Sequence, residues 1–297
     1  MARQRRRGCL PVLVTVGLVA ALVVLAVVAV VALLDRANPA PAAAERCFAA
    51  LDGTEWRLSP DQAQHAALAS AVATRRGMPA RAVTIGIATA LQESRLENID
   101  YGDRDSVGLY QQRPSQGWGT VEQIMDPVYS TTKFFEGLEK VPGYQDMAVT
   151  EAAQAVQRSG FPDAYAQHEV RARAWASALT GHSPAALRCE LREVAEPGGT
   201  DAVLARVVRD LGEVPVTVTP GDGTAPPTVD LTATALPIDD PARAGWFAAQ
   251  WAVAVAWAVD LDAVTVGDLT WTRSTPTWEP TGVEALAPGQ VRLAVAG

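Results

Sequence analysis

Cysteine and histidine are scarce in this sequence, with three of each among 297 residues. The histidines are scattered, and the chain has no His-Glu-x-x-His sequence of the kind that binds zinc. It also lacks the Gly-x-Ser-x-Gly turn of serine hydrolases and the glycine-rich loop that holds nucleotide phosphates. We therefore expect neither a metal centre nor a cofactor.

Positive charge is also limited, because 33 acidic residues outweigh 25 basic ones and give a net charge of −8. Proteins that bind nucleic acids usually present a basic face, so we expect no nucleic-acid partner. The one basic cluster lies in residues 1–9, directly before an apolar run. A hydrophobic content of 48% excludes a mainly disordered chain.

Charged residues are absent from residues 10–34. A helix of this length, rising about 1.5 Å per residue, would cross a bilayer core about 30 Å thick. We expect a single-pass plasma-membrane anchor with a cytoplasmic N-terminus over residues 1–9, a spacer over 35–46, and extracytoplasmic domains beyond it. The alternative is a cleaved signal peptide, although the apolar region of such peptides usually spans only about 7–15 residues.

Two of the cysteines, Cys47 and Cys189, flank one segment that we expect to lie outside the cytoplasm, where thiols oxidise. The third, Cys9, lies at the cytoplasmic edge of the apolar run and cannot join them. We predict a structural disulfide between Cys47 and Cys189.

Helical periodicity dominates residues 60–180, with no alternating strand of any length. We expect helices over residues 60–76, 79–96, 127–140, 150–158 and 162–180. Two capping boxes mark helix starts: Ser59 with Gln62, and Thr120 with Gln123. The pattern predicts a mainly helical domain over residues 47–192.

Composition changes after Cys189, and the Glu-Pro-Gly-Gly sequence at 196–199 marks a boundary. Beyond it the order helix-strand-strand-helix-strand-strand predicts a small α+β domain over residues 193–297, with helices covering an antiparallel sheet.

Glu93 lies near the end of the second predicted helix, and its helical neighbours Ala90, Thr89, Gly86 and Ala82 are all small. Such a stripe would leave an open groove in front of the carboxylate. With no basic neighbour to hold it ionised, the pKa of Glu93 would rise into the range of a general acid. The alternative is close helix packing, with Glu93 as a solvated charge at the helix end.

Three further segments add to this pattern. Glu93-Ser94, the Ser106–Gln111 sequence Ser-Val-Gly-Leu-Tyr-Gln, and the alanine-rich stretch 152–160 together resemble the lysozyme-like lytic transglycosylase family. The resemblance covers residues 57–181 and is closest to a divergent actinobacterial branch. In addition, residues 245–273 resemble an accessory domain found behind cell-wall hydrolases of such bacteria.

The resemblance implies a lysozyme-like fold that cleaves peptidoglycan glycan strands, with Glu93 as catalytic acid and base. The residues that it implies for binding sugar are Ser94, Ser106, Tyr110, Gln111, Trp118 and Gln157. Val156 and Gln157 stand where the family usually carries Tyr-Asn. The alternative function is therefore a non-catalytic peptidoglycan-binding or scaffold protein of the cell envelope.

Three aspartates in the following loop, Asp100, Asp103 and Asp105, are candidates for a second carboxylate. Glycosidases that use water commonly pair two carboxylates across the scissile bond, and one of these aspartates would serve that role in a hydrolase. The alternatives are a solvated acidic loop and a calcium site, although a third ligand and a closing glutamate are missing from the calcium pattern.

Overall fold

The computed structural model describes residues 22–28, 30, 44–159, 162–194 and 198–296. The chain divides into two units, one before and one after the link between Ala44 and Glu45. The second unit contains the disulfide, both sheets and the hydrophobic core.

The predicted membrane-spanning helix over residues 10–34 is not seen, and the predicted fold class is wrong in this respect. Of these positions, 22–28 and 30 are described and are helical. No helix within the described residues is both long and apolar enough to cross a bilayer. The other positions of the predicted anchor lie outside the described residues.

The first half of the second unit contains a three-stranded antiparallel sheet, which the predicted mainly helical class omitted. Strand β1 (Arg46–Leu51) pairs with both β2 (Thr54–Leu58) and β3 (Leu187–Glu190). Asp52 and Gly53 join β1 to β2 with positive φ at both positions, which is the geometry that an Asp-Gly hairpin turn favours. Cys47 lies opposite Cys189 in the β1–β3 register, and the predicted disulfide between them is confirmed.

The helices of this half lie between β2 and β3 in the chain and pack on one another. Both predicted capping boxes are present, at the starts of the first and third helices below. The α-helices are α2 (Pro60–Arg75), α3 (Ala80–Ser94), α4 (Val121–Met125), α5 (Pro127–Leu138), α6 (Val149–Gln157) and α7 (Glu169–Leu179). Two 3₁₀ segments accompany them: η1 (Pro114–Gln116) and η2 (Pro162–His168).

The second half is a six-stranded antiparallel sheet with two helices. The sheet order is β4-β5-β9-β6-β7-β8. Its strands are β4 (Val216–Thr219), β5 (Thr228–Thr232), β6 (Leu261–Val266), β7 (Leu269–Thr272), β8 (Glu279–Pro280) and β9 (Gln290–Val295). The helical elements are α8 (Thr200–Leu211), η3 (Ala233–Ala235) and α9 (Pro241–Val255).

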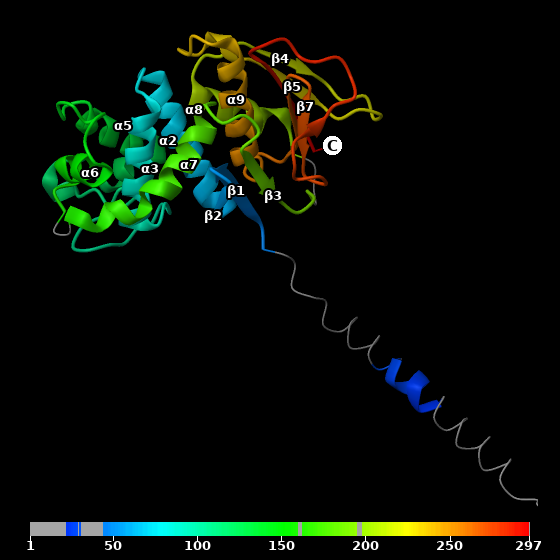
Figure 1. Cartoon of the computed structure of the whole chain (residues 1–297), viewed down its shortest axis with the longest axis horizontal. Helices are drawn as coiled ribbons and strands as arrows, with labels where there is room; N and C mark the ends of the chain where they lie inside the picture. The colour runs from blue at the N-terminus through cyan, green and yellow to red at the C-terminus, as the bar shows by residue number, and fades with distance from the viewer. Residues whose placement is uncertain (1–21, 29, 31–43, 160–161, 195–197, 297) are drawn as a thin grey trace, which may run out of the picture. The chain divides into compact units, whose positions relative to one another are not determined.

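Helix α9 joins the two halves, because it packs on α2, α7 and β3 on one side and on β6 and β9 on the other (Figure 1). Its Gln250 is fully buried and donates to the carbonyls of Ala178 (2.7 Å) and Ser183 (3.1 Å). The side-chain oxygen of Gln250 accepts from the amide of Leu187 at 2.8 Å. Residues on both sides of the predicted boundary at 192–193 thus belong to one compact unit.

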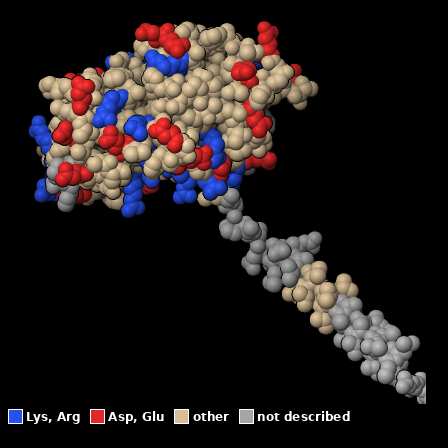
Figure 2. All heavy atoms as spheres, viewed as in Figure 1, with Lys and Arg blue, Asp and Glu red and all other residues tan. Residues whose placement is uncertain are grey.

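Side chains of both charge signs are interspersed over the face of this unit that Figure 2 shows.

Candidate active site

Glu93 is the penultimate residue of α3, where the helix is stopped by two consecutive residues with left-handed backbone. Arg95 and Leu96 have φ values of 59° and 65°. Side chains of α2 hold this turn: Nε2 of Gln62 donates to the Arg95 carbonyl at 2.7 Å, and Nδ1 of His65 lies 3.0 Å from the Leu96 carbonyl oxygen. The end of α3, and with it the Glu93 carboxylate, is therefore fixed by the neighbouring helix.

The Glu93 carboxylate is bonded by neutral groups. The hydroxyl of Tyr165, in η2, donates to Oε1 of Glu93 at 2.6 Å. The side-chain amide of Gln157 also hydrogen-bonds this carboxylate, and its Nε2 donates to the Tyr110 carbonyl at 2.8 Å.

Burial raises the pKa of Glu93, and the hydrogen bonds from Tyr165 and Gln157 only partly oppose that effect. No cation contributes to the shift. The direction agrees with the expectation from the sequence, and it makes the protonated carboxyl available at a higher pH than for an exposed glutamate.

The small-residue stripe of α3 does not form a groove, contrary to one interpretation of the sequence. Ala82, Thr89 and Ala90 are completely buried. A Cβ on Gly86 would lie 2.9 Å from the ring of Phe135 in α5. The stripe is a helix-packing surface, and the space in front of Glu93 is formed by other segments.

That space is a cleft of about 630 Å³, bounded on one side by the loop that follows α3 and on the other by the end of α6. Glu93, Ser106, Gln111, Trp118 and Gln157 all line it. Five of the seven residues that the sequence proposed as catalytic or sugar-binding are thus brought together. This volume lies within the range of about 300–1,000 Å³ that is typical of ligand sites.

The remaining two, Ser94 and Tyr110, lie in the core and do not line the cleft. Oγ of Ser94 donates to the carbonyl of Leu109 at 2.8 Å, which ties the loop to the end of α3. The ring of Tyr110 is 1% exposed and stacks on Phe134 with ring centroids 4.5 Å apart. The sugar contacts predicted for these side chains are corrected to structural roles.

The glycine of the Ser-Val-Gly-Leu-Tyr-Gln segment has a clear steric reason. Gly108 has a φ of 79°, and a Cβ there would lie 2.8 Å from the carbonyl oxygen of Ile124. Beyond it, Nε2 of Gln111 donates to the carbonyls of Tyr101 (3.2 Å) and Gly108 (3.3 Å). The segment is a tight turn that presents Gln111 at the cleft wall.

The three loop aspartates differ from one another. Asp105 accepts from Nε of Arg113 and from the backbone amide of Ser115, both at 2.8 Å, and these bonds lower its pKa well below the usual range. Its carboxylate therefore holds the loop together. Asp100 is exposed and does not line the cleft, whereas Asp103 does.

No local sequence signal indicated Tyr165. This residue is fully buried, and burial together with the adjacent Glu93 carboxylate raises the pKa of its phenol. The expected helix over 162–180 begins instead with the 3₁₀ turn η2, which carries Tyr165.

Among the described residues, no group of three or more histidine, cysteine, aspartate or glutamate side chains is placed to hold a metal ion. The chain matches no model of a known protein family and no curated protein.

Proposed function

We propose that this protein cleaves the glycan strands of peptidoglycan outside the cytoplasm, with Glu93 as general acid and then general base. The observation that carries the proposal is a carboxyl group of raised pKa on a cleft wall, whose hydrogen-bond donors among the described residues are neutral. A general acid must hold its proton near the working pH, and this environment favours that state.

In the proposed reaction, the protonated Glu93 carboxyl donates its proton to the glycosidic oxygen as the C1–O bond breaks. The positive charge that develops on the sugar is spread over its C1 and ring oxygen. The C6 hydroxyl of the same sugar then attacks C1, and the Glu93 carboxylate takes the hydroxyl proton. The product is an anhydro sugar end, and Glu93 returns to its protonated state.

The surrounding residues support this cycle in different ways. Tyr165 and Gln157 would stabilise the carboxylate that forms after the first proton transfer, since both already donate to it. Trp118 is half-buried on the cleft wall and offers an aromatic face to a sugar ring. The disulfide supports a location outside the cytoplasm, because such bonds persist in oxidising compartments.

The test is to incubate purified cell-wall sacculi with the protein and with Glu93→Gln, and to analyse the released fragments by mass spectrometry. We expect anhydro ends from the wild type, and a loss of at least about 100-fold in the variant, since a general acid contributes about 10²–10⁴-fold. Reducing ends in place of anhydro ends would indicate hydrolysis, with Asp103 as the candidate second carboxylate. Binding without products, equal in both proteins, would support the non-catalytic alternative and contradict the proposal.

A further inference from the structure

A second cavity, which we call the side cavity, adjoins the Glu93 cleft and has the same volume of about 630 Å³. Gln116, Trp118, Gln157 and Arg158 line both spaces. The two are therefore neighbours that share a wall, and one branched ligand could occupy both.

The side cavity has a mixed lining that includes three apolar residues. Val141, Ala155 and Val156 line it, and Val156 is 8% exposed. A Cβ on Gly137 would lie 3.0 Å from Cγ1 of Val156 and 3.9 Å from the Trp118 ring, so α5 approaches α6 closely here.

Two cations, Lys140 and Arg158, also line the side cavity. Both are exposed, and within the described part of the chain neither is hydrogen-bonded to a carboxylate. Lys140 acts on Glu136 through space, but the Glu136 carboxylate is already bonded to Nζ of Lys133 at 2.9 Å.

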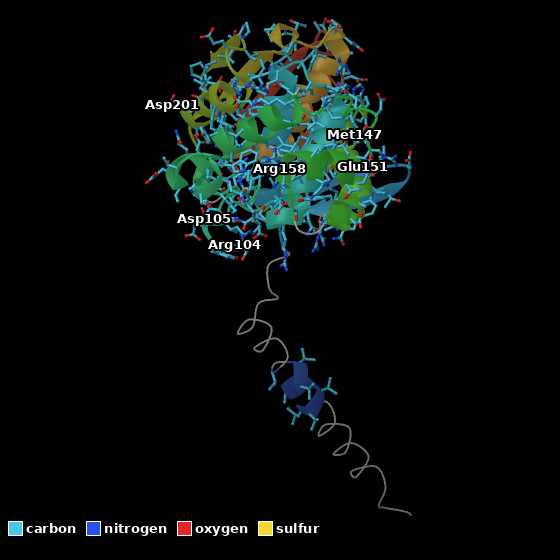
Figure 3. The ribbon with its side chains drawn as sticks, turned by 90° about the vertical axis from the view of Figure 1, so that its left-hand side faces the viewer. Arg104, Asp105, Met147, Glu151, Arg158 and Asp201 are labelled. Carbon is cyan, nitrogen blue, oxygen red and sulfur yellow. A yellow bond between two sulfur atoms is a disulfide. The ribbon has the colours of Figure 1, made fainter. Side chains whose placement is uncertain are left out.

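Lys140 and Arg158 have no hydrogen-bonded carboxylate among the described residues, whereas Arg113, which lines the Glu93 cleft, is paired with Asp105 at 2.8 Å. Figure 3 shows Arg158 on the same face of the molecule as Arg104 and Asp105, turned toward the viewer. The two cations are thus available to an anionic ligand in a chain whose net charge is −8.

We propose that the side cavity binds the peptide arm of the glycan strand, so that the enzyme prefers strands that carry their peptides. Small alkyl side chains of the peptide would contact Val141, Ala155 and Val156, and a peptide carboxylate would pair with Lys140 and Arg158. A phosphate group on the strand would pair with the cations but would make no apolar contact with the three alkyl side chains. That the peptide is attached to a glycan strand is an assumption taken from the proposed function.

The experiment compares two substrates: strands that carry their peptides, and strands stripped of them by an amidase. Lys140→Glu is the test variant, because Lys140 lines only the side cavity and is not part of the Glu93 cleft. Arg57→Glu is the matched control, since Arg57 is an exposed cation on β2 and lines neither cavity.

We expect Lys140→Glu to raise the KM for peptide-bearing strands about tenfold, the effect of losing one charged contact, with kcat unchanged. The KM of Lys140→Glu for stripped strands should equal the wild-type value. For Arg57→Glu, KM and kcat should equal the wild-type values on both substrates. An equal KM change on both substrates, or no change on either, would overturn the proposal.

Binding of the same strands to Glu93→Gln, measured by calorimetry, separates this inference from the proposed function. If the wild-type protein cleaves neither substrate, the proposed function fails. The side cavity would still be supported as a peptide site if Glu93→Gln binds peptide-bearing strands more tightly than stripped strands and adding Lys140→Glu removes this difference. Equal binding of the two kinds of strand would contradict it.

Discussion

Glu93 and Asp210 occupy the same position in two helices, since each is the penultimate residue, of α3 and of α8 respectively. Both carboxylates therefore lie near the negative end of a helix dipole. Asp210 is completely buried and bonds Nε of Arg206 (2.7 Å), Nε of Arg209 (2.8 Å) and the indole of Trp251 (3.0 Å). Among the described residues, the hydrogen-bond partners of the Glu93 carboxylate are the phenol of Tyr165 and the amide of Gln157.

The comparison shows that partners, and not helical position, separate a structural carboxylate from a candidate acid. Two guanidinium groups compensate a buried negative charge at Asp210, and Arg206 in turn reaches Oε1 of Gln64 in α2 at 2.8 Å. At Glu93 the charge is not compensated, so burial favours the neutral form. The first site holds helices together, and the second can exchange a proton.

The largest expected effect on stability comes from removing the compensated carboxylate. Asp210→Ala leaves Arg206, which is 7% exposed, without its partner, and should lower the free energy of unfolding by about 3–5 kcal/mol. Urea denaturation at neutral pH measures this loss. Asp201→Ala, at an exposed position in the first turn of the same helix, is the control, and an equal loss in both variants would contradict the account.

A smaller loss is expected from Gln250→Leu, at the contact between the two halves. The change leaves the Leu187 amide and the carbonyls of Ala178 and Ser183 without this partner. An unsatisfied buried group costs about 1–3 kcal/mol, so we expect a loss of about 2 kcal/mol or more in the same denaturation experiment. Gln145→Leu, at an exposed position, should change stability little.

In the cleft, Tyr165→Phe should change the pH profile more than stability. The Tyr165 hydrogen bond lowers the pKa of Glu93, so its removal should raise that pKa further. Activity that depends on protonated Glu93 would then persist to higher pH. We expect kcat/KM to stay within about tenfold of the wild-type value, because one hydrogen bond contributes about 1 kcal/mol. If the alkaline limb of the pH–activity profile moved to lower pH in Tyr165→Phe, the proposed effect of Tyr165 on the pKa of Glu93 would be contradicted.

The smallest expected effect is a gain in stability. Because the folded-state pKa of Glu93 is raised, its favourable contribution to folding is present at acid pH and is lost as pH rises through that pKa. Glu93→Gln, which cannot ionise, should therefore have a higher Tm than the wild type at neutral pH, and the difference should shrink below about pH 4, where Glu is protonated in both states. A Tm difference that does not vary with pH would argue against a raised pKa.

Much of the helical half could be predicted because its signals are local. The capping residues Ser59 and Thr120 mark helix starts, and each lies three residues from its partner. The β1–β3 pairing was missed because Arg46 and Glu190 pair across most of the helical half, although the Asp52-Gly53 turn was visible. The disulfide was the one long-range contact that chemistry alone indicated.

The candidate site shows the same limit. The absence of a basic side chain on the face of α3 next to Glu93 could be predicted from Thr89 and Ala90, because these neighbours lie on the same helix. Tyr165 reaches Glu93 across 72 positions of sequence, and no local pattern predicts that contact. The interior positions of Ser94 and Tyr110 likewise depend on how the loop folds back on α3.

The proposed function depends on the raised pKa of the half-buried Glu93 carboxyl, and a titration of this group measures it directly. The carboxyl carbon resonance of Glu93, assigned by its absence in Glu93→Gln, can be followed by NMR across pH in protein labelled at glutamate. The account predicts a midpoint above the value of about 4.3 that is usual for glutamate. A midpoint at or below that value would contradict it.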